Sequence, residues 1–550
     1  MHFKGFRLGW SRLALLGWVI TAGTVAPTAS LAQSNDDLSG TVTISLQSND
    51  TQTWNAVART YEDLHPNVTV NVELKPQEGY QEFLRAQFAA GTPRASLVNL
   101  NVVQDLINED KFLDFAAYLD DTNPYTGKSW RESLDETAVA NMVSPEGEMY
   151  ALNLETVQVL WFYNQQAFAE AGILEEAEAL AETERNQPSW TQFLGWCDQL
   201  TEAGYIPVAI EGDFNSFWQF RFGWLARIYI DQYTRDWNQL VRCQEGDYCF
   251  REGVDDQWTY DPSDPGNDDA TKLTLNISRQ MNALRDGTTP IDGPEFRALY
   301  TNLKEFSDRC TPPGWIGTTD AYPLFLTQKA AIRLDVATLL TSFEKDIRSL
   351  SEGEYVPADA AEGETLQEDT SAFEIGSFNM PSMEGPEVDA PARTIEVTTG
   401  FLGVPRKDRQ QNDLEVDFLM YLTSPEGFGT YLANTLDPAN LRGSIAGPPI
   451  VKDVALPDAY AEQFSQLRLI GNMEKNTAGR LPARGVADYQ PSVREWVDLS
   501  QQYFNDGITL DQFLGQYDAS IDRLFPELLE HLQLVEGDLA TPAKTPVNQD

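Results

Sequence analysis

Histidine is nearly missing from this 550-residue chain, which contains 3. Apart from His2, these are His65, which precedes the helix-stopping Pro66, and His531 near the C-terminus. They form no HExxH zinc motif and leave no histidine for a catalytic triad. A GxxxxGK(S/T) phosphate loop is also absent from the sequence. These absences argue against zinc hydrolysis, triad chemistry and nucleotide hydrolysis, and we expect neither a cofactor nor enzyme activity.

Basic residues are few relative to acidic ones. The chain has 39 Lys and Arg against 84 Asp and Glu, which gives a formal charge of -45. Nucleic acids and anionic membrane surfaces bind proteins that offer a net cationic surface. Both classes of partner are therefore excluded, and the acidic surplus indicates a solvated, aggregation-resistant surface.

Cysteine is also scarce, with Cys197, Cys243, Cys249 and Cys310 as the full set. Their spacing matches no paired CxxC zinc pattern. In an oxidising compartment Cys243 can close a small loop with Cys249, and Cys197 can pair with Cys310 if the fold brings them together. The sequence alone leaves the pairing open.

The N-terminus has the pattern of an export signal. Basic residues precede an apolar run at 13–26, and Ser30-Leu31-Ala32 supplies small residues at the cleavage positions. We expect residues 1–32 to be a signal peptide and the protein to be periplasmic. A retained membrane anchor is the alternative, but the run is short against the roughly 20 residues of a bilayer span. No Cys follows the cleavage site, which argues against a lipoprotein.

Strand and helix patterns alternate from residue 41 onward, as in a wound α/β domain. Strands are expected at 41–46, 67–74 and 95–100, with helices through 54–64 and 80–88 between them. Residues 148–164 then form one long extended stretch. About 15 residues is too long for a strand of one small sheet, so this stretch is predicted to cross from one lobe to another.

The second half of the chain repeats the α/β pattern with more helix. The expectations are a helix at 190–203, a strand at 206–210, a surface insertion at 231–269, loops at 345–370 and 380–393, helices at 413–422 and through much of 486–535, and a disordered tail at 536–550.

Several stretches resemble one family in sequence order: FAAGTP at 88–93, GEMYAL at 147–152 with FYN at 162–164, WTQFLGWCDQL at 190–200 with AGYIP at 203–207, QKAAI at 328–332 and SPEG at 424–427. They are similar to the extracellular solute-binding proteins of carbohydrate ABC importers, the maltose-binding-protein-like family. Departures from that pattern include Arg94 and Ala95 where an Asp is usual, and Asn153 near the usual Pro.

The resemblance implies a two-lobed α/β fold with a ligand cleft between the lobes and a hinge that closes on binding. In this layout residues 33–152 and 326–400 form the first lobe, and 157–325 and 401–535 the second. The implied function is capture of a mono- or oligosaccharide, or a sugar-containing osmolyte, by a monomer that delivers it to membrane-embedded ABC permease subunits.

Candidate ligand-binding residues in the first half are polar side chains at strand ends and in the crossover. Sugars present hydroxyl rims, so a site needs carboxylates, amides and Arg groups for specificity. The candidates are Gln47, Ser48, Asn49, Asp50, Asn101 and Glu155. Asn49 or Asp50 can alternatively cap the following helix, and Trp54 fits the apolar stripe of that helix.

Candidates from the second half include aromatic platforms for the apolar ring faces of a sugar. They are Trp218, Trp315, Asp335, Thr399 and Arg442, with Arg484 as a further charged donor. Trp315 fits a platform or a core plug equally well. Asp335 interrupts an apolar stretch, and because an uncompensated buried carboxylate is costly, it is expected to face the cleft or pair with Arg333.

Two other classes stay open at this point. An extracellular glycoside hydrolase would also be acidic, exported and aromatic-rich, but its two catalytic carboxylates cannot be picked out among 84 acidic residues. A calcium-stabilised surface protein is suggested by the Asp residues between 255 and 269. These residues do not follow EF-hand spacing, so a solvated loop is the simpler interpretation and no metal is expected.

Overall fold

The computed structural model describes residues 38–546, except 77–78, 92, 108, 145–146, 358–359 and 361–362. The expected signal peptide at 1–32 lies outside the described residues. Among the helices of the described part, none combines the length and apolar character needed to span a bilayer.

The first lobe begins with alternating strands and helices: β1 Gly40–Ile44, α1 Thr51–Leu64, β2 Val68–Val72, α2 Tyr80–Ala89 and β3 Val98–Asn99. β1 pairs in parallel with β2 from Gly40↔Val68 to Ile44↔Val72, and Ile44 also pairs in parallel with Leu97. The inward face of β1 and the apolar stripe of α1 share one hydrophobic core. The predicted β/α order of this region is confirmed.

A later segment of the chain returns to the same core. β9 Leu402–Gly403 pairs antiparallel with β3, and the helices α15 Arg409–Leu422 and α16 Pro425–Thr435 pack beside α1. Leu402, Phe418 and Leu432 are buried in the core that holds Val42. Residues from 401 to about 467 therefore lie in the first lobe, and their expected place in the second lobe was wrong.

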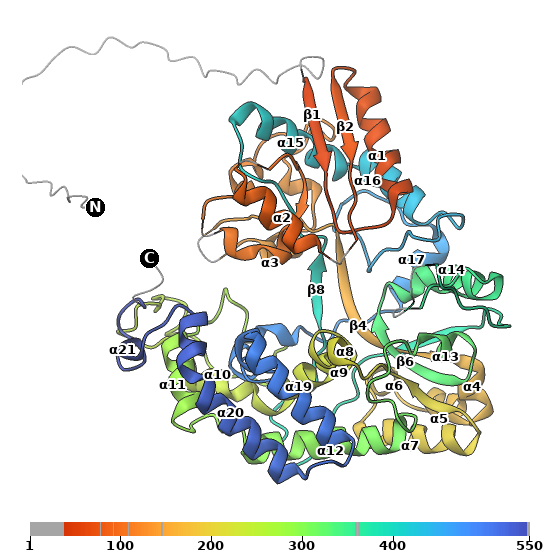
Figure 1. Cartoon of the computed structure of the whole chain (residues 1–550), viewed down its shortest axis with the longest axis vertical. Coiled ribbons are helices and arrows are strands. Elements are labelled where there is room, and N and C mark those ends of the chain that lie inside the picture. The colour runs from red at the N-terminus through yellow and green to blue at the C-terminus, as the bar shows by residue number, and fades with distance from the viewer. Residues whose placement is uncertain are drawn as a thin grey trace, which may run out of the picture.

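β4 Glu155–Asn164 runs from the lobe junction into the second lobe (Figure 1). Its first four residues pair antiparallel with β8 Glu396–Thr399, and its later residues pair antiparallel with β6 Ala330–Val336 and β7 Ile375–Phe378. The predicted crossing is confirmed, although the regular strand is shorter than the extended stretch of 148–164.

The second lobe is built on a mixed sheet in the order β5–β6–β4–β7. β5 Ile206–Ala209 runs parallel to β6, whereas β6 and β7 run antiparallel to β4. Because β6 and β7 pair with the second-lobe half of β4, residues 326–336 and 375–395 belong to this lobe. The expected assignment of these residues to the first lobe was therefore wrong.

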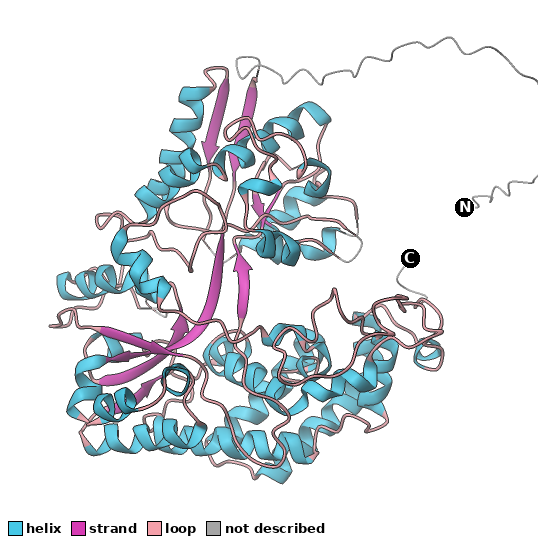
Figure 2. Cartoon of the chain, turned by 180° about the vertical axis from the view of Figure 1, so that it is seen from behind, coloured by secondary structure: helices cyan, strands magenta, loops and turns pink. Residues whose placement is uncertain are grey.

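Helices cover both faces of the second-lobe sheet (Figure 2). One hydrophobic core contains residues of α7 Trp190–Glu202, α9 Arg221–Thr234, α12 Pro294–Cys310, α19 Gln490–Phe504 and α20 Leu510–His531. A smaller cluster on the other face contains residues of α13 Tyr322–Leu326 and α14 Leu339–Glu352. The predicted helices at 190–203 and within 486–535 are confirmed.

The remaining helices are α3 Glu136–Met142, α4 Gln165–Glu170, α5 Ile173–Ala179, α6 Glu182–Asn186, α8 Phe214–Trp218, α10 Asn238–Val241, α11 Ile277–Arg285, α17 Asp458–Ser465, α18 Thr477–Arg480 and α21 Glu536–Leu539. Gln104–Ile107 and Phe115–Tyr118 form short 3-10 turns.

Three further expectations differ from the structure. The segment 231–269 is anchored in the core, because Asp231, Arg235 and Arg393 form a fully buried ion-pair network with Asp268. The segment 536–546 is folded: Leu539 is buried in the second-lobe core and the Pro542 carbonyl accepts from the Asn276 side chain. Residues 345–352 are helical within α14, where a loop was expected.

Two disulfides link the cysteines in the pairs that the sequence allowed. Cys197 of α7 is bonded to Cys310 of α12, and Cys243 to Cys249. The first bond joins helices 113 residues apart in sequence, and the second closes a loop with a separation of 6. A cross-link constrains the unfolded chain more strongly when its loop is longer.

We expect replacement of Cys197 and Cys310 by Ser to lower the free energy of unfolding by about 2–4 kcal/mol, since this loop is long. Replacement of Cys243 and Cys249 by Ser is the matched control and should lower it less. Chemical denaturation of both double variants measures the difference. An equal or larger loss for the short loop would contradict the assignment.

Candidate functional site

The strand ends of both lobes meet where the lobes join. The arrowheads of β1 and β2 point toward the second lobe (Figure 1). In the second lobe β6 ends at Val336, and the next residue, Ala337, is buried in the first-lobe core. Ligands of α/β sheets bind beyond the carboxyl ends of the strands. The residues that follow β1, β3, β5 and β6 are therefore the candidate site.

A buried ion-pair network lies on the second-lobe side. Arg221 binds Asp335 through both Nη atoms at 3.1 and 3.0 Å, and its Nε lies 3.0 Å from Glu211. Arg333 bonds Asp335 at 2.8 Å and Glu211 at 3.0 Å. Burial opposes ionisation of Glu211, but the two guanidiniums outweigh it and lower its pKa to about 2. Asp335 thus pairs with Arg333, one of its two expected roles, while its side chain stays 16% exposed.

Aromatic side chains adjoin this network at the start of α9. Phe220 is 40% exposed and contacts Trp224 edge to face, while the Arg221 guanidinium lies 5.0 Å from the Trp224 ring centre. Trp218 is half-buried, and its indole N–H is buried without a hydrogen-bond partner in the described part of the chain. Phe220 and Trp218 therefore supply apolar surface next to charged groups, whereas Trp224 is buried beneath them at 8% exposure.

Trp315 is a core residue, one of the two roles that the sequence allowed. Its exposure is 5%, its ring stacks on Phe217, and its indole N–H donates to Ser307 Oγ at 3.0 Å. The structure therefore removes Trp315 from the candidate site.

The residues after β1 divide into structural and exposed side chains. Asp50 is buried as the cap of α1, where it accepts from Thr53 N at 3.1 Å and from Asn440 Nδ2 at 2.8 Å. Asn49 is exposed, and Gln47 and Ser48 are half-buried. Asp50 therefore caps the helix, as one of the sequence alternatives proposed, whereas the other three side chains are at least partly exposed to solvent.

β3 and the adjoining loops complete the first-lobe side. Asn99 Oδ1 accepts from Gln47 N at 2.7 Å, and Asn99 Nδ2 donates to the Gly400 carbonyl at 3.2 Å. Asn101 is exposed in the turn that follows. Arg442 is also exposed, and its backbone N–H donates to Asn440.

Glu155 and Thr399 lie opposite each other on β4 and β8, where the chain passes between the lobes. Glu155 is 6% exposed, and its Oε2 accepts from Ala446 N at 2.6 Å. Burial raises the pKa of Glu155 to about 7, although this N–H and Tyr431 both favour the carboxylate. The structure brings Glu155 and Thr399 together at the junction, while Trp218 and Asp335 lie on the second-lobe side.

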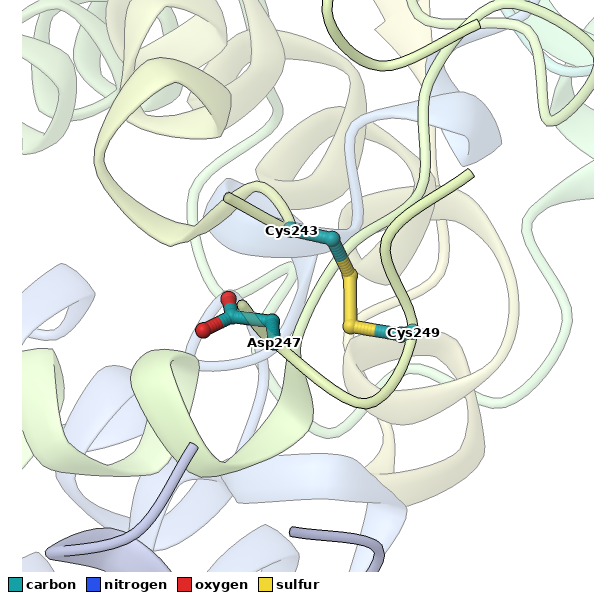
Figure 3. Close-up of side chains that lie close together, drawn as sticks. All are labelled: Cys243, Asp247 and Cys249. Atoms are coloured by element: carbon teal, nitrogen blue, oxygen red, sulfur yellow. A yellow bond between two sulfur atoms is a disulfide. The ribbon is translucent and has the colours of Figure 1, made fainter. Parts of the chain in front are cut away.

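The acidic segment near residue 260 is occupied by protein partners. Asp268 pairs with Arg393, Asp264 with Lys272, and Asp255 accepts the Thr274 N–H. Among the described residues, only Cys243, Asp247 and Cys249 gather with metal-ligand geometry. There the two sulfurs form a disulfide (Figure 3), and Asp247 binds both Nε and Nη2 of Arg279. This group therefore lacks free thiolates for a metal.

Sequence reasoning missed Arg221, Glu211 and Phe220. Glu211 lies two residues after the end of β5, so the strand-end rule that selected Asn101 could have selected it too. Phe220 and Arg221 begin α9 beside Trp218, but an aromatic-rich helix gives no signal of which ring stays exposed.

The chain is similar to known proteins in part of its sequence and in its fold. Residues 47–272 match the family model described as bacterial extracellular solute-binding protein. No curated protein matches the chain.

Solved structures share the fold at low sequence identity. The putative binding protein MsmE from Bacillus subtilis, in an open conformation, is 14% identical with a TM-score of 0.54, over 90% of this chain and 99% of that one. Apo RafE from Streptococcus pneumoniae is 14% identical with a TM-score of 0.53, over 88% and 98%. The cyclic α-maltosyl-1,6-maltose binding protein from Arthrobacter globiformis is 12% identical with a TM-score of 0.52, over 89% and 100%. The expected two-lobed α/β fold of a solute-binding protein is confirmed.

The buried Glu155 predicts a pH dependence of stability. Its pKa is about 7 in the folded protein against about 4.5 unfolded, so the unfolded chain loses this proton first as the pH rises. Stability from this group is therefore lost between about pH 4.5 and 7, by up to about 3 kcal/mol. Glu155→Gln should raise the Tm relative to the parent protein more at pH 8 than at pH 5.

Differential scanning calorimetry at both pH values measures this difference. Exposed Glu109→Gln is the control and should show no such trend. A Tm difference for Glu155→Gln that is the same at pH 5 and pH 8 would show that the carboxyl is not raised in pKa.

Proposed function

We propose that the protein is the substrate-binding component of an ABC importer. It captures a mono- or oligosaccharide, or a sugar-containing osmolyte, between its lobes by hinge closure. The observation that carries this function is the pair of separate hydrophobic cores joined through β4 and β8. Lobes with independent cores can move as bodies about a few connecting residues.

A sugar is the ligand class favoured by both chemistry and comparison. RafE has been solved in complex with raffinose, and another protein of the same fold is a chitin oligosaccharide binding protein. In this chain Phe220 and the half-buried Trp218 offer apolar surface for a ring face, and Arg221 and Asp335 offer polar groups beside it. Gln47, Asn49 and Asn101 would supply amides from the opposite lobe.

Delivery completes the proposed function. The acidic, exported chain would act in the periplasm as a monomer and hand its sugar to membrane-embedded permease subunits. The family model that matches residues 47–272 describes extracellular proteins, which supports this location.

Ligand binding is tested by thermal unfolding of the mature chain with a panel of mono-, di- and oligosaccharides and glycosidic osmolytes. A ligand bound only by the folded state stabilises it by RT ln(1 + [L]/Kd), which is about 2.7 kcal/mol at 100 Kd. We expect one class of sugar to raise the Tm in a saturable way. No shift with any member, or hydrolysis of one, would overturn the proposal, and hydrolysis would favour a glycoside hydrolase.

The role of Phe220 is tested with the sugar that the panel identifies. Phe220→Ala should weaken its binding about fivefold, since an aromatic contact contributes about 1 kcal/mol beyond the buried area. Leu240→Ala is the matched control, because Leu240 is 46% exposed on α10 of the same lobe. Equal effects of the two substitutions would remove Phe220 from the site.

A further inference from the structure

A second cluster of charged groups lies beside Trp218. It contains three guanidiniums, those of Arg227, Arg480 and Arg484, and two carboxylates, those of Glu474 and Asp488. The network around Arg221 is balanced, with two cations and two anions, whereas this cluster has one cation in excess. The excess is unusual in a chain whose formal charge is -45.

The carboxylates of the cluster are shared unevenly. Glu474 serves two cations, with Arg227 Nη1 at 2.7 Å from Oε1 and Arg480 on Oε2. Arg484 is left with Asp488, 3.0 Å away. The Arg484 side chain is 13% exposed, but that of Asp488 is 58% exposed. An ion pair with a solvated partner contributes at most about 1 kcal/mol, so Asp488 is easily replaced.

The cations of the cluster are incompletely compensated. Burial, together with the charge of Arg484, lowers the pKa of Arg227 to about 10. Burial also lowers the pKa of Arg484. Both shifts have the direction expected where a buried cation lacks a full anionic partner.

The loop that presents Arg484 is held in a strained conformation. Ala487 and Asp488 have φ values of 53° and 55°, a region that residues with a side chain rarely adopt. Tyr517 OH accepts from Gly485 N, and Ser492 Oγ accepts from Val486 N, so neighbouring helices fix the loop. Strain of this kind persists where the surrounding structure over-determines it, and it is frequent at ligand sites.

Arg484 is tied to the candidate site through Trp218. One of its Nη atoms donates to the Trp218 carbonyl, and Trp218 packs against Gly223 at the start of α9. Two residues before Gly223, Arg221 binds Asp335 at the end of β6. Arg484 therefore adjoins Trp218, one of the aromatic residues of the proposed site.

We propose that the captured sugar is acidic, a uronic acid or an oligosaccharide containing one, and that Arg484 binds its carboxylate in place of Asp488. This inference rests on the proposed function. Arginine binds carboxylates through two parallel hydrogen bonds that are stronger than neutral ones. Because the chain as a whole repels anions, an acidic ligand requires a local excess of cations.

Calorimetric titration of the mature chain tests the inference with matched pairs of sugars, galacturonate against galactose oligosaccharides and glucuronate against glucose ones. We expect one acidic member to bind about tenfold tighter or better than its neutral counterpart, the ratio given by one charge-assisted hydrogen bond. Arg484→Gln should abolish this ratio by weakening the acidic sugar alone, and Arg484→Lys should retain part of it. Arg409→Gln, at an arginine 91% exposed on α15 of the other lobe, should change nothing.

The outcomes separate the two proposals. Binding of neutral sugars with equal or weaker binding of acidic ones overturns the inference and leaves the proposed function intact. Failure of every sugar to bind overturns both. A preserved acidic preference in Arg484→Gln also overturns the role of Arg484, and the preference in the parent protein can be measured even if a variant does not fold.

Discussion

The pairing of β4 with three different strands determines how this chain is divided. Its first four residues pair with β8 at the junction, and the rest of the strand is a central member of the second-lobe sheet. Leu154, just before β4, is buried in the first core, whereas Val159 is buried in the second. The strand is therefore packed into both lobes. Motion between the lobes must bend this ladder and the other connections, and it leaves each core unchanged.

The second lobe contains three sets of ion pairs that differ in burial and in net charge. Asp231, Arg235, Asp268 and Arg393 form a closed, buried set that fixes a long polar segment to the core. Such sets are costly to break, because removal of one partner leaves an uncompensated buried charge. The set around Arg221 is also balanced but reaches the edge of the site, and the set around Arg484 has one cation in excess. The set that fixes the polar segment is fully buried, whereas the two sets proposed to meet the ligand are partly open to solvent.

The sequence predicts element types better than it predicts partners. Alternation in 41–46 and helical spacing in 54–64 indicate which face of each element is apolar. The structure has β1 and α1 at these two positions. The same patterns do not say which lobe supplies the covering surface. Residues 326–336 and 375–395 were therefore expected in the first lobe and 401–467 in the second, the reverse of the structure. Trp315 and Asp50 illustrate the same limit at the site. The local sequence does not tell a buried aromatic ring such as Trp315 from one that faces a ligand, or a helix-capping carboxylate such as Asp50 from one that binds a ligand. Glu155 was accessible to sequence reasoning because it lies in the extended stretch at 148–164, which is long enough to mark the crossing.

The central claim is that two lobes with separate cores close on a ligand about the β4–β8 junction. It is tested most directly by the distance between fluorophores on cysteines introduced at Arg409 of the first lobe and Leu240 of the second, both exposed. All four native cysteines are in disulfides, so only the introduced thiols are labelled. The account predicts that a saturating sugar shortens this distance while the unfolding of each core stays cooperative. An unchanged distance with the sugar bound would contradict it.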